Sequence, residues 1–246
     1  MTTTATLLVE LVAEELPPKA LKSLGEAFAD SLANGLRSRD FLSEQSTAVP
    51  YATPRRMAVA ISHVRSVAPD AELNEKLMPA KVARDNLEAL RKKLAPLGRG
   101  QLATPTLDAR DGPDQLYVLS DGKADYVYLR RLAKGQPLAR GLQDALDEAI
   151  ESLPIPRVMI YARRDAYYND VKFVRPAHRL VALHGADIVP VTALGLQGGR
   201  TTDGHRFLGR RAIDIASAEA YAPTLEAEGK VIPSFSARRD KIAAEL

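Results

Sequence analysis

The strongest constraint on the fold is an amphipathic pattern over residues 138–153. Apolar residues recur there at steps of three and four, so they share one stripe of an α-helix whose other side is acidic. The stripe comprises Leu138, Leu142, Ala145, Leu146, Ala149, Ile150 and Leu153. A helix of this kind gains most of its stability by packing its stripe against other elements. The chain must therefore build a core around it, and Pro154 predicts where the helix ends.

A second apolar stripe follows Pro17-Pro18, a pair that ends extended structure and opens a helix. Its members are Leu21, Leu24, Phe28, Leu32 and Leu36. Strand-like patterns accompany the two helices, beginning with the apolar run at residues 6–12. Three further strand pairs are expected. The first joins residues 46–51 to 57–64, and the second joins 116–119 to 124–132 through a turn at Asp121-Gly122. The third joins 179–183 to 188–196 through a turn at 185–187.

The remaining patterns predict helices over residues 82–94 and 217–228, and a last helix from Ser234 onward. Residues 95–115 are rich in glycine and proline, which favours a loop or linker. We therefore expect an N-terminal α+β domain over 1–95, a linker or loop over 96–115, and a second α+β domain over 116–233. Residues 234–246 are expected to start a helix that leads to further domains, because that helix has no stop signal.

Composition narrows the class of protein. The chain of 246 residues has no cysteine, which excludes disulfides and thiolate chemistry, and no apolar run long enough for a membrane span. The formal net charge is +3, but residues 157–211 hold ten Lys or Arg against four Asp or Glu. A basic stretch on an otherwise slightly acidic chain favours a polyanionic partner, and a solvated basic surface is the alternative interpretation.

Motifs for small-molecule chemistry are absent from the sequence. It holds no GxxxxGK phosphate loop, no GxSxG nucleophile turn and no recognisable adenylation motif of either synthetase class. His178 and His184 with Asp203 and His205 could be imagined as a metal site, but their spacing matches no metal motif. We expect no metal there, and structural or hydrogen-bonding roles for these histidines.

The basic segment 157–175 interleaves cationic and aromatic residues, a composition typical of RNA contact. The RNA-binding candidates are Arg157, Arg163, Arg164, Tyr167, Lys172, Arg175 and Arg206. Arg163 and Arg164 are the expected phosphate ligands. A purely structural role for the aromatic residues of this segment is an equal alternative.

Two further places carry candidate residues. Arg55 and Arg56 lie in a turn opened by a proline, where they could hold a phosphate or a partner's carboxylate, or could pair with Glu14 or Glu15 or face water. His205 and Arg206 lie between Gly204 and Gly209. Ordering of that turn and contact with a ligand are equally compatible with the pattern.

Five short segments, taken in order, resemble the β subunit of the bacterial two-subunit glycyl-tRNA synthetase. They are Glu-Glu-Leu-Pro-Pro-Lys-Ala-Leu at 14–21, Thr-Pro-Arg-Arg-Met at 53–57, Leu-Pro-Ile-Pro at 153–156, Phe-Val-Arg-Pro-Ala-His at 173–178 and Gly-His-Arg-Phe-Leu-Gly at 204–209. The resemblance runs along almost the whole chain but covers only the N-terminal part of the longer family chain. Met159-Ile160-Tyr161 departs from the family, which usually has Met-Arg-Trp after the third segment.

The resemblance implies an α+β fold of antiparallel sheets with packed helices, similar to the body and tail domains of archaeal CCA-adding enzymes. It implies a cytoplasmic ligase of two α and two β subunits, in which the α subunit uses ATP and Mg²⁺ to activate glycine. The β subunit would contribute most of the recognition of tRNA(Gly). This part of it would hold no catalytic residue and no cofactor, and its downstream HD-type and anticodon-binding domains would be missing.

Two other functions compete with that interpretation. One is a stand-alone RNA-binding module that has no part in aminoacylation. The other is a small metal-dependent hydrolase that would use His178, His184 and Asp203.

Overall fold

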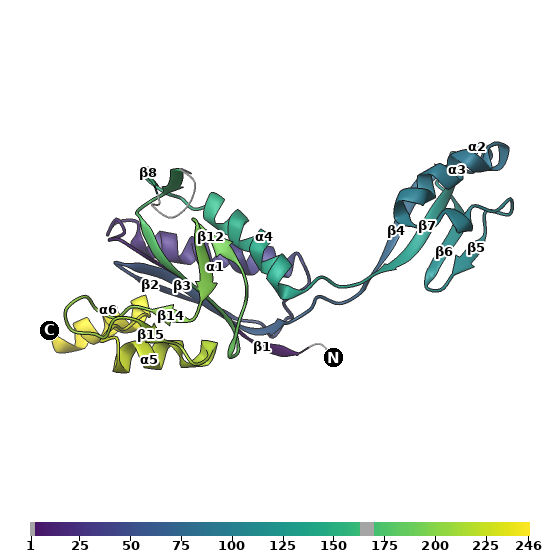
Figure 1. Cartoon of the computed structure of the whole chain (residues 1–246). Coiled ribbons are helices and arrows are strands. Elements are labelled where there is room, and N and C mark those ends of the chain that lie inside the picture. Colours follow the sequence, from purple (N-terminus) through teal and green to yellow (C-terminus); the bar gives the residue numbers. More distant parts are fainter. Residues whose placement is uncertain (1–2, 163–169) are drawn as a thin grey trace. The chain divides into compact units, whose positions relative to one another are not determined.

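A computed structural model describes residues 3–162 and 170–246, and the chain divides into two compact units (Figure 1). Unit 1 comprises Met1–Ala68 and Gln136–Leu246, and unit 2 comprises Pro69–Gly135. This division differs from the one expected from the sequence, which placed a linker at 96–115. Those residues belong to unit 2, where Leu102 and Leu107 are buried in the core. Their glycines and prolines form turns and short 3₁₀ helices within a packed unit.

The sheet of unit 1 has seven strands in the order β12-β13-β10-β1-β3-β2, with β11 paired to β10. Its strands are β1 (Thr4–Ala13), β2 (Ala48–Thr53), β3 (Arg56–Arg65), β10 (Ala177–His184), β11 (Asp187–Ile188), β12 (Thr192–Ala193) and β13 (Leu196–Gly199). The central strand β1 is antiparallel to both β3 and β10, whereas β13 joins β10 in parallel. The strand predicted over 188–196 is instead divided among three short strands, and Leu194 and Gly195 turn the chain with positive φ between β12 and β13.

Helices α1 (Leu21–Arg37) and α4 (Leu138–Glu151) cover one face of this sheet (Figure 1). Both predicted stripes face the core, with Leu24, Phe28 and Leu142 fully buried. The two helices predicted from their periodicity are therefore confirmed. The Pro17-Pro18 pair precedes α1 as expected.

The opposite face of the sheet is covered by the C-terminal part of unit 1 (Figure 1). Its elements are β14 (Thr201–Thr202), β15 (Ile213–Asp214), the 3₁₀ helix η3 (Ala218–Ala220), α5 (Tyr221–Ala227) and α6 (Phe235–Glu245). Ile213, Ile215 and Leu225 pack there against Leu8 and Val181. Because both faces are covered, β1 is buried continuously from Leu7 to Ala13.

Two smaller features complete unit 1. β8 (Met159–Ala162) and β9 (Asp170–Phe173) form an antiparallel pair. The last helix begins where the sequence predicted, since the Ser234 hydroxyl accepts the N–H of Ala237 at 3.2 Å. The helix predicted over 217–228 is shorter, because its first turn is η3.

Unit 2 is a four-stranded antiparallel sheet in the order β4-β7-β6-β5. Its elements are β4 (Ala71–Pro79), α2 (Ala80–Asp85), α3 (Leu87–Leu94), η1 (Ala95–Leu97), η2 (Gly100–Leu102), β5 (Ala109–Asp111), β6 (Asp114–Ser120) and β7 (Asp125–Ala133). The hairpin at Asp121-Gly122 is confirmed, and Gly122 has the positive φ of 86° that the turn requires. The single helix predicted over 82–94 is broken at Asn86, whose side chain caps α3.

The structure thus has a mixed α+β fold with mostly antiparallel sheets. Within residues 3–162 and 170–246, no helix is long and apolar enough to cross a membrane.

Candidate functional site

Three of the five segments that carry the family resemblance are joined by main-chain hydrogen bonds at the end of β1. The N–H of Glu14 donates to the carbonyl of Pro176 at 2.9 Å, and the N–H of Leu16 donates to the carbonyl of Pro54 at 2.6 Å. Segments 14–21, 53–57 and 173–178 therefore meet, although their contacts join residues up to 164 positions apart in the chain. The pairing of β1 with β3 and β10 produces this convergence.

Glu14 is the side chain on which these segments converge. Its carboxylate accepts from Nη2 of Arg55 at 3.2 Å and lies 2.9 Å from Nε2 of His178. The hydrogen bond with His178 is the main cause that lowers the pKa of Glu14, and the charges of Arg55 and Arg206 lower it further. Beside it, Nε of Arg175 donates to the carbonyl of Glu15 at 2.9 Å. Arg206 thus brings the fifth segment within electrostatic reach of the other three.

The fifth segment is a tightly built loop, residues 204–209. The N–H of His205 donates to the carbonyl of Gly229 at 2.7 Å, and the N–H of Gly204 donates to the carbonyl of Arg210 at 2.8 Å. A Cβ added to Gly209 would overlap the carbonyl of Gly229, so the two backbones are in direct contact. The imidazole Nδ1 of His205 accepts the N–H groups of Phe207 and Leu208 at 3.3 and 3.2 Å. His205 therefore orders the loop.

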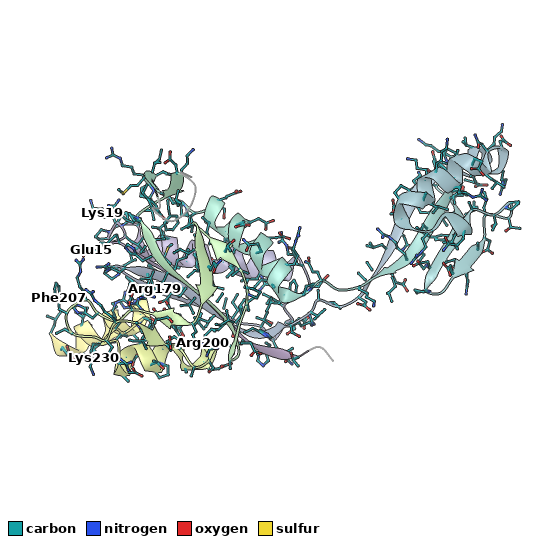
Figure 2. The ribbon with its side chains drawn as sticks, viewed as in Figure 1. Glu15, Lys19, Arg179, Arg200, Phe207 and Lys230 are labelled. Carbon is teal, nitrogen blue, oxygen red and sulfur yellow. The ribbon has the colours of Figure 1, made fainter. Side chains whose placement is uncertain are left out.

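The loop holds two large apolar side chains in solvent. Phe207 is 84% exposed and Leu208 is 72% exposed, while Arg206 beside them is also exposed. Figure 2 shows Phe207 at the same end of unit 1 as Glu15 and Lys19. A fixed loop that presents an aromatic ring next to a guanidinium can stack on a flat group and bind an anion.

Arg56 has a different role from the one considered in the sequence analysis. It is only 3% exposed, so it can hold neither a phosphate nor a partner's carboxylate. Its Nη1 donates to Glu10 Oε1 at 3.1 Å, and the hydroxyl of Tyr221 donates to the same oxygen at 2.6 Å. Its Nη2 donates to the carbonyl of Asp203. The sequence interpretation was wrong for Arg56, because it starts a strand that is covered on both faces.

Glu10 and Tyr221 were missed by the sequence analysis. Glu10 is fully buried in the middle of β1, and burial, reinforced by the Glu10 charge, raises the pKa of Tyr221 so that its hydroxyl remains a donor. The carboxylate of Asp203 accepts from Nε of Arg179 at 2.8 Å and from the N–H of Ala212 at 2.9 Å. The network therefore ties the base of the 204–209 loop to the central strand. A lone charge within the apolar run of β1 was the available signal for Glu10.

The other predicted residues are distributed around unit 1. Arg157 and Lys172 are exposed next to β8 and in β9, whereas Arg163, Arg164 and Tyr167 lie outside the described residues. Tyr161, at the position that departs from the family pattern, accepts the N–H of Ala177 at 3.0 Å.

The metal-dependent hydrolase site considered for His178, His184 and Asp203 does not form in the part of the chain that the structure describes. Nε2 of His184 lies 2.8 Å from the carbonyl of Val64, while His178 contacts Glu14 and Asp203 accepts from Arg179. Among the described residues, no three His, Cys, Asp or Glu side chains form a group that could hold a metal ion.

Comparison with known proteins identifies similar chains. A family model described as the glycyl-tRNA synthetase beta subunit matches residues 7–246. The glycine–tRNA ligase beta subunits of Ralstonia nicotianae and Methylobacillus flagellatus are each 48% identical to this chain over 98% of its length. That of Aromatoleum aromaticum is 45% identical over 100% of it. In each case the match covers 34% of the relative, so the chain spans about a third of the length of these curated relatives.

Proposed function

Since the chain belongs to the glycyl-tRNA synthetase beta-subunit family, we propose that it is the N-terminal portion of the β subunit of a cytoplasmic glycine–tRNA ligase and that unit 1 contacts tRNA(Gly). In this role it works with an α subunit, in a tetramer of two α and two β subunits. The α subunit binds ATP, Mg²⁺ and glycine and forms the adenylate. Resemblance to the body and tail domains of CCA-adding enzymes supports contact on the acceptor side of the tRNA.

One observation carries the proposal for unit 1: four of the five segments shared with the family converge at the end of β1, three through hydrogen bonds and the fourth through the charge of Arg206. We define this junction surface by Lys19, Arg55, Arg175, His178, Arg206 and Phe207. Arg55 and His178 contact Glu14, whereas Lys19 and Arg206 form no ion pair with any described residue. Arg206 adjoins the exposed Phe207 in the chain, and Lys19 lies at the same end of unit 1 (Figure 2). Exposed cations and an exposed aromatic ring on one surface favour contact with phosphates and bases. Arg157 and Lys172, with Arg163, Arg164 and Tyr167 of the undescribed segment, remain further candidates.

The test is salt-dependent binding of the 246-residue chain to a tRNA(Gly) transcript, measured by fluorescence anisotropy. Each lost phosphate contact lowers the slope of log affinity against log salt by about 0.7–0.9. The double variant Lys19→Ala/Arg206→Ala should therefore bind more weakly and with a slope reduced by about 1.5. Arg140→Ala is the matched control, because this arginine pairs only with Asp144 of its own helix in the described structure. An unchanged slope in the double variant would remove the junction surface from the RNA interface.

A second role for the same surface, docking of the α subunit, is favoured by the exposure of Phe207 and Leu208. It predicts that the chain co-elutes with the α subunit on size exclusion and that Phe207→Ser/Leu208→Ser abolishes co-elution while tRNA binding persists. Co-elution that survives the double substitution would exclude this loop from the interface with the α subunit.

A further inference from the structure

Unit 2 presents one face of its sheet without a covering helix among the described residues. Helices α2 and α3 pack on the other face, where Leu116, Val127 and Leu129 form the core. Along β7, Tyr126, Tyr128 and Arg130 alternate with those buried residues. The period of two in a strand places all three on the uncovered face.

Neighbouring strands add matching residues to this face. Tyr117 of β6 is the register partner of Tyr128, and Asn74 and Lys76 of β4 are opposite Arg130 and Tyr128. Tyr117, Tyr126 and Tyr128 are half-buried, while Lys76 and Arg130 are exposed. We define the tyrosine face by Tyr117, Tyr126, Tyr128, Lys76 and Arg130.

The side chains of the tyrosine face are held in place by one another. The rings of Tyr117 and Tyr128 lie with centroids 5.7 Å apart and planes inclined by 24°. Nζ of Lys76 is 3.3 Å above the ring of Tyr126, and the guanidinium of Arg130 is 5.6 Å from the ring of Tyr117. The hydroxyl of Tyr117 donates to Oδ1 of Asn74 at 3.2 Å. Rings that are already ordered lose little conformational entropy when a ligand binds.

The charges select the class of partner. Lys76, Arg110 and Arg130 occupy the uncovered side by strand register, against Glu72 at one end and Asp121 in the hairpin turn. Lys76 is partly neutralised by Asp121 at 3.1 Å, whereas Arg130 forms no ion pair within the described residues. Aromatic rings interleaved with cations on an open sheet suit unpaired nucleotides, whose bases stack and whose phosphates are anionic.

We propose that the tyrosine face binds an unpaired segment of RNA, with bases stacked on Tyr117 and Tyr128 and phosphates on Lys76 and Arg130. The proposal rests on the function assigned above only for the identity of the RNA, which would be the tRNA. It places an RNA contact on unit 2, separate from the junction surface of unit 1. Double-stranded RNA does not satisfy this site, because paired bases offer no free ring faces.

The experiment measures anisotropy of a fluorescein-labelled 12-nucleotide oligouridine, a 12-base-pair RNA duplex and a tRNA(Gly) transcript with the whole 246-residue chain. Each base that no longer stacks should cost roughly tenfold in affinity. Tyr117→Ala/Tyr128→Ala should therefore weaken oligouridine binding about a hundredfold with an unchanged salt slope, because no phosphate contact is lost. Tyr117→Phe/Tyr128→Phe is the matched control, since it keeps both rings and should bind within about twofold of the parent chain.

Arg130→Ala provides the complementary result, a salt slope reduced by about 0.7. Circular dichroism checks that each variant folds, and Lys76→Glu/Arg130→Glu, which keeps every ring, tests the same face by charge reversal if the alanine pair unfolds. Unchanged oligouridine affinity in a folded alanine or glutamate pair overturns the proposal. So does a pair that keeps RNA affinity but loses co-elution with the α subunit, which would assign the face to protein. Failure of the parent chain to bind any of the three RNAs would overturn the RNA role of unit 1 as well.

Discussion

Arg55 and Arg56 are adjacent in the chain and experience opposite environments. The Arg55 side chain is 28% exposed and pairs with a Glu14 side chain that is 39% exposed. The Arg56 side chain is 3% exposed and pairs with a fully buried Glu10. Glu10 Oε2 and Arg56 Nε have no hydrogen-bond partner within the described structure. A buried charge pair that is not fully satisfied depends strongly on both partners, because either charge alone would be costly in the interior.

Replacement of Arg56 should therefore lower the stability much more than replacement of Arg55. We expect Arg56→Ala to lower the free energy of unfolding by roughly 3–5 kcal/mol, because it leaves the Glu10 carboxylate buried without a counter-charge. Arg55→Ala is the matched control and should cost no more than about 1 kcal/mol, as exposed pairs do. Urea unfolding followed by circular dichroism compares the two variants. Equal losses would contradict the assignment of a buried pair to Arg56.

The Glu14 carboxylate stabilises the folded chain to an extent that depends on pH. Its pKa in the folded chain lies below the ordinary value of 4.5, chiefly through His178. The stabilisation is therefore complete above pH 4.5 and is lost as the pH falls through the folded-state pKa.

His178→Ala should raise the pKa of Glu14 toward its ordinary value and shrink the loss of stability in acid. Arg55→Ala should raise the pKa less, because its charge is the smaller cause. A carbon-13 NMR titration of the Glu14 carboxyl group measures both shifts. A pKa of Glu14 that does not change in His178→Ala would show that the contact is absent in solution.

At the scale of elements, the connection between β14 and β15 combines a rigid base with an apolar tip. Its base is held by Gly204, Gly209 and Gly229, whose backbones approach too closely for a side chain. Arg210 adds a main-chain bond to Glu228 at 3.0 Å and an ion pair with its carboxylate at 2.6 Å. Exposed Phe207 is thus presented by a fixed support rather than by a loose chain end.

Gly209→Ala should loosen this loop. The added methyl group overlaps the Gly229 carbonyl, and a backbone shift to relieve it should cost roughly 1–3 kcal/mol. Hydrogen exchange should accelerate at the amides of His205 and Arg210, which donate to Gly229 and Glu228.

Gly100→Ala is the control for that variant. Its Cβ would lie 3.5 Å from a side-chain carbon of Arg91, an ordinary contact distance. Unaltered exchange at both loop amides in Gly209→Ala would rule out the tight backbone contact.

At the scale of the whole chain, unit 2 is inserted between two parts of unit 1. The insertion points are hydrogen-bonded to each other, since the N–H of Ala68 donates to the carbonyl of Gln136 at 3.0 Å. Val67 and Pro137 form an antiparallel bridge beside them. Each unit has a separate cluster of buried residues. Unit 1 draws the centre of its sheet from both parts, with β1 and β3 from the first and β10 from the second.

A chain in which residues 69–135 are replaced by Gly-Ser-Gly should keep unit 1 folded. The two ends already meet, so a short connection needs little rearrangement, and the core of unit 1 loses no side chain. Cooperative thermal unfolding and a dispersed NMR spectrum would confirm this, whereas a chain without cooperative unfolding would contradict it. The same deletion should abolish oligouridine binding at the tyrosine face while leaving the junction surface intact.

The chain by itself should not form glycyl-adenylate, because its sequence holds no recognisable adenylation motif and the proposed function places that site on the α subunit. Glycine-dependent exchange of pyrophosphate into ATP measures this, with the α subunit added as the positive control. Pyrophosphate exchange by the chain alone would overturn the placement of the adenylation site on the α subunit.

Local physical chemistry determined the elements whose information lies within a few residues. Periodicity identified α1 and α4, the Asp121-Gly122 pair identified the β6–β7 hairpin, and Ser234 marked the start of α6. These features follow from side-chain spacing, positive φ and capping, which a short stretch of sequence specifies. The family relationship was likewise visible in the order of the five segments.

Only the tertiary structure decided which distant residues meet. Leu11 pairs with Leu180 and Met57 across three strands, and this pairing brings Glu14, Arg55 and His178 together. The local sequence pattern of an apolar strand does not select one pairing partner over another. Neither the junction surface nor the burial of Arg56 was therefore predictable from the sequence. The tyrosine face emerged in the same way, because strand register sets Tyr117 beside Tyr128. Strand pairing is selected by the packing of the whole core, which no single segment contains.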